Sequence, residues 1–155
     1  MNSQQKPSHT GPMLHIASRE LTGHALNWVV ATALSIPVTV HKGRALTTVP
    51  NITNPVLEVE FGYKPFNPTG NWAVGGPLKT GHRISTVQKH DGWWVACIYD
   101  MNDDPQFMEI SHDELEAAMR CLVHSHFGRT VLVPAELLGR PLTTVAAGER
   151  RGVST

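Results

Sequence analysis

The chain has 155 residues, of which 41% are hydrophobic and 17% charged, with 13 basic and 13 acidic side chains. This length fits a single domain, and the composition is too apolar for a disordered polyampholyte. Zero formal net charge argues against a general nucleic-acid or membrane binder. The start is polar and no apolar run could span a membrane, so we expect a soluble intracellular protein with free thiols at Cys97 and Cys121.

Charge is distributed unevenly along the chain. Residues 41–89 carry six basic side chains and two acids, whereas residues 91–116 carry eight acids and no lysine or arginine. Such asymmetry can steer a charged ligand, or it can simply mark two solvated faces of one domain.

The first expected element is a helix. Residues 1–17 are rich in Gly, Pro, Ser and His, and we expect them to be flexible. Thr22 is a suitable N-cap for a helix that Pro37 ends. Only a narrow polar stripe marks this helix, so we expect it to be mostly buried, with a contribution to an oligomer interface as a further suggestion.

Strands and a second helix follow. Strand-like runs lie at 38–40, 45–49, 56–61, 83–89 and 93–99. Asp91-Gly92 predicts a hairpin between the last two runs, and the apolar character of both faces of 93–99 predicts a central strand. Ser111 and Glu114 have the spacing of a capping box for a helix that Gly128 ends.

The chain closes with a short strand at 131–133 and a helical turn at 134–138. We expect the tail, residues 139–155, to be flexible. The elements together predict an α+β fold: one globular domain over residues 18–138, with a small, mainly antiparallel sheet and two main helices.

Residues 63–77 show neither helical nor strand periodicity, so we interpret them as a long loop that either binds a ligand or is pinned to the core by its aromatic side chains. In a ligand loop, tryptophan stacks on a base, glycine amides and nearby cations hold phosphate, and asparagine contacts the ribose or base. The candidate ligand-binding residues are Phe66, Asn71, Trp72, Gly75, Gly76, Lys79, Arg83 and Arg120.

No metal or cofactor site is predicted. On a helix His126 points away from Cys121 and His124, and no second ligand pair accompanies them. Asp100–Asp104 is interpreted as a turn because it lacks the glycine and terminal glutamate of an EF-hand loop. No phosphate-loop, dinucleotide or nucleophile motif is present, although nine histidines leave general-base chemistry open.

Three ordered blocks carry a family resemblance. They begin at Leu21-Thr22-Gly23, at Phe66 with the run Trp72-Ala73-x-Gly75-Gly76-Pro77, and at Leu115. Over residues 19–138 they resemble the phage NinX-like family, with one departure at Ser111–Glu114, before the last helix. The resemblance implies a tailed-phage or prophage accessory protein in the cytoplasm of the infected or lysogenic host, without a settled activity.

Three functional hypotheses follow. The first is non-catalytic binding of a small anionic nucleotide-type ligand, such as a cyclic dinucleotide or an ADP-ribose derivative, which would sequester a host-defence signal. The second is a nucleotide-processing enzyme in which His82, His90, His112 or His124 acts as a general base. The third is a protein that inhibits a host defence enzyme through an acidic face at residues 100–116. Membrane and nucleic acid are not expected partners, and a homo-oligomer is compatible with the first hypothesis.

Overall fold

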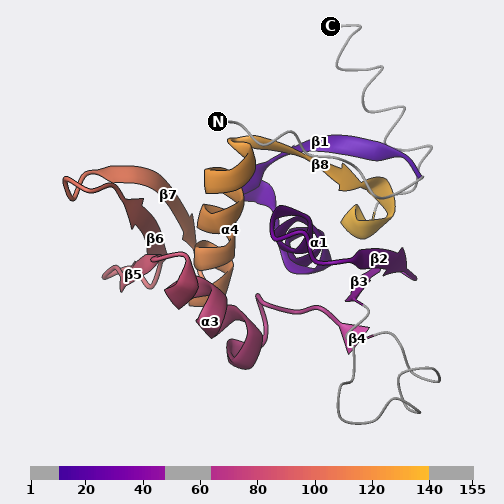
Figure 1. Cartoon of the computed structure of the whole chain (residues 1–155), viewed down its shortest axis with the longest axis horizontal. Helices are drawn as coiled ribbons and strands as arrows, with labels where there is room; N and C mark the ends of the chain where they lie inside the picture. Colours follow the sequence, from indigo (N-terminus) through magenta and orange to yellow (C-terminus); the bar gives the residue numbers. More distant parts are fainter. Residues whose placement is uncertain (1–10, 48–63, 140–155) are drawn as a thin grey trace, which may run out of the picture.

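A computed structural model describes residues 11–47 and 64–139 (Figure 1). Across these residues the fold is α+β, as predicted, with helices packed among antiparallel sheets of two, three and three strands. The predicted strand at 56–61 lies outside the described residues, as do residues 1–10 and 140–155 of the two predicted flexible segments.

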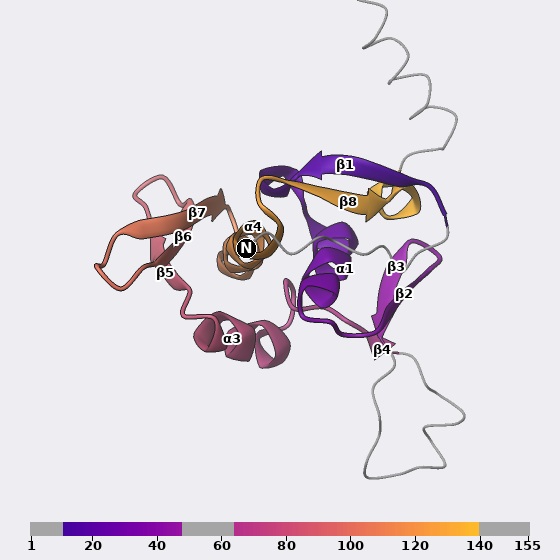
Figure 2. The ribbon, with the colours of Figure 1, turned by 45° about the horizontal axis from the view of Figure 1, so that its top comes forward.

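Helix α1 (Gly23–Ala33) forms the centre of the core. Its residues from Ala25 to Ala31 are all buried, because apolar side chains occupy nearly every face of the helix. Figure 2 shows β1 and β8 on one side of α1 and α4 beside it. The helix therefore packs within its own chain, which argues against its suggested role in an oligomer interface.

The N-terminal boundary of the fold differs from the prediction. Residues 13–17, expected to be flexible, form strand β1 (Met13–Ala17), which pairs antiparallel with β8 (Thr130–Pro134). The Ser18 amide then donates to the Arg129 carbonyl at 2.8 Å, at the start of the short 3₁₀ turn η1 (Ser18–Glu20). The partner strand lies more than 110 residues away in sequence, so local composition could not reveal this pairing.

A second sheet lies on the side of α1 that faces away from α4 (Figure 2). Strands β2 (Val38–His41) and β3 (Arg44–Thr47) form a hairpin, and β4 (Lys64–Pro65) adds a short third strand. Lys42 and Gly43 both have positive φ, 50° and 71°, which is the backbone required by a two-residue hairpin turn of matching twist.

The third sheet contains β5 (Ser85–Gln88), β6 (Trp94–Tyr99) and β7 (Pro105–Ser111), with β6 in the centre as predicted. Strand β7 was not predicted, because the acidic residues that precede it were interpreted as a turn and the alternating pattern of the strand itself was not recognised. These acidic residues do form the predicted turn: the Asp100 carboxylate accepts hydrogen bonds from the Asn102 and Asp104 amides, at 2.8 and 2.9 Å.

Helix α4 (Glu114–Phe127) covers the inner face of this sheet and ends at Gly128, as predicted. The predicted capping box does not form. The Ser111 hydroxyl donates to Glu116 at 2.7 Å, and Glu114 accepts from the Thr86 hydroxyl at 2.6 Å. The short 3₁₀ turn η2 (Ala135–Leu138) follows β8 where a helical turn was predicted.

The last part of the predicted long loop, residues 72–77, belongs to a helix. Helix α3 (Trp72–Gly81) begins after Asn71, whose side-chain oxygen accepts from the Ala73 amide at 3.0 Å and caps the helix. Three glycines and Pro77 give this segment a weak intrinsic helix propensity. Contacts with α4 and with the preceding turn stabilise the helix instead. The local sequence pattern does not contain these contacts, so it predicted a loop.

Candidate functional site

The eight predicted ligand residues lie in different environments of the described structure. Phe66 is 7% exposed and belongs to the core, whereas Trp72 is 54% exposed on α3. The Asn71 side chain is used in capping. The Gly75 amide donates to the Asn71 carbonyl at 2.8 Å, and Gly76 lies within the helix, so neither glycine forms the phosphate cradle that an irregular loop would offer.

Gly75 has a packing role. A Cβ atom at this position would lie 2.1 Å from the Pro68 carbonyl oxygen and 2.9 Å from Cδ2 of Leu115. Only glycine therefore lets α3 approach both the preceding turn and α4 this closely. At Gly76 the nearest contact of such a Cβ is Cε3 of Trp72 at 3.5 Å, an ordinary distance.

Two of the three predicted phosphate-binding cations have partners within the fold. Lys79 Nζ lies 3.4 Å from Glu114 Oε1. Arg120 donates from Nε to the Leu21 carbonyl and from Nη1 to the Ile110 carbonyl, at 2.7 and 2.8 Å, and Nη2 lies 2.8 Å from Glu116. Arg120 therefore ties α4 to the start of α1 and to β7.

Arg83, the third predicted cation, is exposed where α3 leads into β5, with φ of 56°. No described carboxylate lies within ion-pair distance of it. None of these eight residues lines the pocket that opens between β1, β7 and α4.

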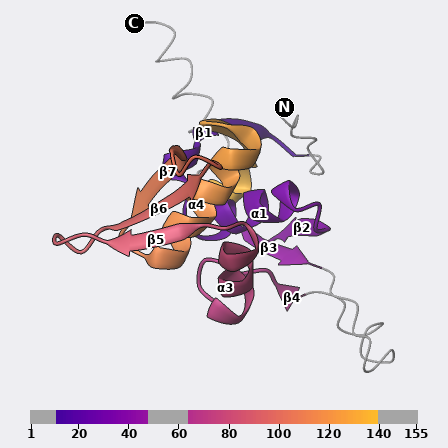
Figure 3. The same ribbon diagram turned by 60° about the vertical axis from the view of Figure 1, so that its left-hand side comes forward.

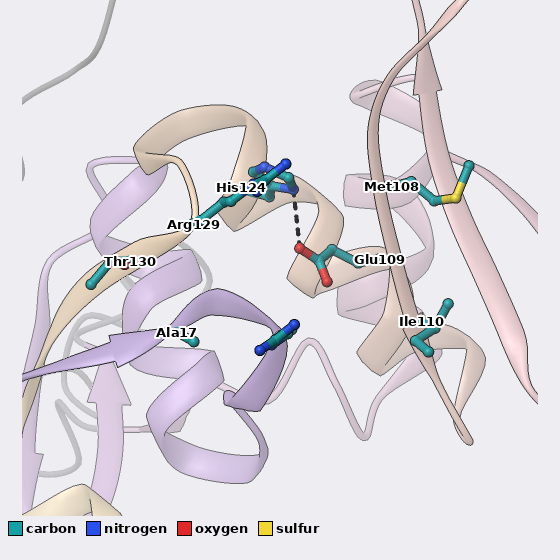
Figure 4. Close-up of a pocket in the computed structure, with 8 residues that line it drawn as sticks. Ala17, Met108, Glu109, Ile110, His124, Arg129 and Thr130 are labelled. Atoms are coloured by element: carbon teal, nitrogen blue, oxygen red, sulfur yellow. Dashed lines mark ion pairs between the residues drawn. The ribbon is translucent and has the colours of Figure 1, made fainter.

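A pocket of about 600 Å³ opens elsewhere, where the end of β1 and η1 meet β7, the last turn of α4 and the start of β8 (Figure 4). This volume lies in the usual range for small-molecule sites. The residues that line it are Ala17, Arg19, Met108, Glu109, Ile110, His124, Arg129 and Thr130.

A carboxylate and an imidazole face each other in this pocket. Glu109 Oε1 lies 3.0 Å from His124 Nδ1, and Glu109 is only 9% exposed. Burial raises the pKa of Glu109, although the charges of His124, Arg120 and Arg19 act in the opposite direction. A buried titratable group with a charged partner in a cavity is a typical feature of functional sites.

Two guanidinium groups flank this pair. Arg19 and Arg129 are exposed, and no described carboxylate lies within ion-pair distance of either. Ser18 holds their segments together, since its amide bonds to the Arg129 carbonyl and its hydroxyl donates to the Gly128 carbonyl at 2.6 Å. Guanidinium groups bind phosphate and carboxylate bidentately, so the pocket can receive an anion.

The pocket was not predicted from the sequence because its four ionisable residues come from three segments that are distant in the chain. They are Arg19 in η1, Glu109 in β7, and His124 and Arg129 at and after the end of α4. Arg19 adjoins a strand that was not predicted, and Glu109 lies in one that was not predicted either. A usable signal was present: Phe107, Glu109 and Ser111 alternate toward α4, so a charged side chain occupies an inward position of a strand. His124 was considered as a general base but not paired with Glu109.

The acidic stretch does not form one continuous face. Glu109, Glu114 and Glu116 turn toward α3 and α4, where they contact His124, Lys79 and Arg120 respectively. Asp103, Asp104 and Asp113 are exposed, and Asp100 is half-buried. The acidic face predicted over residues 100–116 would therefore consist mainly of these aspartates.

The cysteines are free, as predicted, and both are buried. Burial raises the pKa of the Cys121 thiol to about 12, so it carries no thiolate at neutral pH. Cys121 donates to the Phe107 carbonyl and His126 Nδ1 lies 3.0 Å from the Leu122 carbonyl, while His124 faces Glu109. In residues 11–47 and 64–139 no three potential ligands of these types gather around a metal position.

Fold and pocket together define a small α+β protein with an arginine-flanked pocket between two of its sheets. A family model described as "Bacteriophage P22, NinX" matches residues 17–126, and the chain therefore belongs to this phage family. No curated protein matches the chain. Among the described residues no helix is long and apolar enough to cross a membrane.

Proposed function

We propose that this phage protein binds a small anionic molecule of nucleotide type in the pocket formed around Arg19, Glu109, His124 and Arg129, and releases it unchanged. The observation that carries the proposal is the buried Glu109–His124 pair, flanked by two guanidinium groups that no described carboxylate neutralises. The site that we propose therefore lies at the junction of β7, α4 and β8, and not at α3, where the sequence pattern suggested it.

The ligand class follows from the donors and acceptors. Arg19 and Arg129 supply paired N–H groups suited to phosphate oxygens. Glu109, held by His124, accepts a hydrogen bond from a sugar hydroxyl or from a base amino group. Cyclic dinucleotides and ADP-ribose derivatives carry both kinds of group, and binding one of them in the host cytoplasm would withdraw a signal from host defence.

The Glu109–His124 contact also favours a second candidate, a nucleotide-processing enzyme. The Glu109 carboxylate lies 3.0 Å from Nδ1 of His124 but does not meet hydrogen-bond geometry there. A small reorientation that aligned the two groups would fix the imidazole and leave Nε2 to take a proton from water. No described serine, threonine or cysteine side chain pairs with His124 as a nucleophile, so such an enzyme would be hydrolytic. Chromatography of the recovered ligand separates the candidates, because a binder returns it intact.

The proposal is tested by thermal shift and isothermal titration against nucleotides, cyclic dinucleotides and ADP-ribose. A ligand that binds the folded state raises the melting temperature by mass action. We expect Arg19→Ala/Arg129→Ala to lose this shift, whereas the matched control Arg83→Ala, an exposed arginine outside the pocket, keeps it. A flat screen, or equal loss in the control, contradicts the proposal.

A further inference from the structure

The third sheet leaves one face uncovered. Its inner face, which includes Trp94, Ala96 and Ile98, packs toward α4 and the core. The register places two rows of side chains on the outer face, Val87–Val95–Ile110 and Ser85–Cys97–Met108, although Cys97 itself is only 4% exposed among its neighbours. Figure 3 brings this sheet in front of α4, and Figure 4 shows Met108 and Ile110 on the side of β7 opposite to Glu109.

This outer face is apolar across all three strands. Val87 is 56% exposed, Met108 52%, and Tyr99 and Ile110 both 47%. An antiparallel sheet with a solvated face normally alternates apolar and polar residues, yet here Ser85 is the only hydroxyl in the two rows and no charge interrupts them. Contiguous exposed apolar side chains on one face of a sheet are a typical feature of interaction surfaces.

Charge around the outer face is separated along the strands. Lys89, in the turn between β5 and β6, is the only lysine or arginine in residues 85–111. Asp103 and Asp104 lie in the turn between β6 and β7, at the opposite end of β6. Near Lys89, the Asp91 carboxylate accepts from the Trp93 amide at 3.1 Å and so serves its own turn.

We propose that the outer face is the interface of a symmetric homodimer in which a second copy of this chain packs sheet against sheet. Aligned sheets stack about 10 Å apart, and two-fold dimers use the same patch on both subunits. A two-fold axis that runs in the plane of the face, across the strands, reverses the strand direction of the second copy. It thereby brings Lys89 of each copy to Asp103 and Asp104 of the other.

The interface adjoins the pocket. Met108 and Ile110 line the pocket margin and also contribute side chains to the outer face. The second copy therefore lies along the β7 edge of the pocket without covering Arg19 or Arg129, which come from η1 and from the start of β8. The dimer does not depend on the identity of the ligand, so it stands or falls separately from the proposed function.

The test is sedimentation velocity of the full chain over a range of concentrations. We expect a dimer for the wild type, and monomers for Val87→Lys and Met108→Lys, whose lysines raise the dissociation constant by at least about tenfold. The matched control Trp72→Lys changes a side chain of similar exposure on α3 and stays dimeric. Circular dichroism and thermal melts verify that each variant folds.

A charge exchange tests the arrangement of the two copies. Lys89→Asp alone and Asp103→Lys/Asp104→Lys together should each weaken the dimer, and the triple variant should regain it because the pairs re-form with reversed sign. A wild type that sediments as a monomer at every concentration overturns the proposal. A dimer that persists in Val87→Lys and Met108→Lys also overturns it. So does a triple variant that fails to regain the dimer, and so does a face that binds only a basic host protein and no second copy.

Discussion

The α3 region and the pocket both contain cations and carboxylates, but they use them differently. On α3 and the facing side of α4, Lys79 lies beside Glu114, and Arg120 joins Glu116 to two backbone carbonyls. Of the three cations predicted for the α3 site, Arg83 alone has no described carboxylate within ion-pair distance. In the pocket, Arg19 and Arg129 have no described carboxylate within ion-pair distance. A basic, glycine-rich segment can therefore be a packing device, and unpaired arginines beside a buried carboxylate are the better indication of a ligand site.

The largest expected effect tests the packing role of Gly75. Gly75→Ala should lower the free energy of unfolding by about 3 kcal/mol, because the added methyl group overlaps the Pro68 carbonyl. Gly76→Ala, the matched control, should be neutral or stabilise by up to about 1 kcal/mol, since its Cβ has space and alanine favours the helix. Urea denaturation measures both, and equal effects would remove the distinction between the two glycines.

An intermediate effect is expected at Arg120. Arg120→Ala should cost about 2 kcal/mol, because the Leu21 and Ile110 carbonyls and the Glu116 carboxylate lose their donor. Arg83→Ala, at an exposed arginine, should change stability by less than about 0.5 kcal/mol. Ligand affinity of Arg120→Ala should be close to that of the wild type; a complete loss of affinity with an intact fold would return Arg120 to the binding site.

The smallest expected effect concerns pH. Because burial raises the pKa of Glu109 above its ordinary value of 4.5, the folded state binds this proton more tightly than the unfolded chain does. Its contribution to stability is therefore present at low pH and is lost as pH rises from 4.5 through the raised pKa. Glu109→Gln should flatten this part of the stability profile, measured by urea denaturation between pH 4 and 7. An unchanged slope would show that Glu109 is not the group responsible.

Much of the fold was predictable from local patterns. The buried α1, the central β6, the Asp100–Asp104 turn and the Gly128 terminus of α4 each rest on periodicity or turn chemistry within one segment. Strand β1 was missed because its partner β8 is remote in sequence. Helix α3 was missed because tertiary packing around Gly75 overrides its weak propensity.

The candidate site could not be predicted in the same way. Its residues meet only after β1 pairs with β8 and β7 packs on α4, and neither β1 nor β7 was recognised. The stacking residue proposed for the ligand, Trp72, does lie exposed, but the glycines beside it serve the helix. Glu109 at an inward position of β7 was the one local sign of the pocket.

The most direct test of the account is chemical-shift mapping on ¹⁵N-labelled protein, titrated with whichever nucleotide, cyclic dinucleotide or ADP-ribose stabilises it most. We predict that the largest shifts fall on Arg19, Glu109, His124 and Arg129 and their neighbours, while the amides of α3 change little. Shifts concentrated on α3, from Trp72 to Gly81, or no shift with any of these probes, would contradict it.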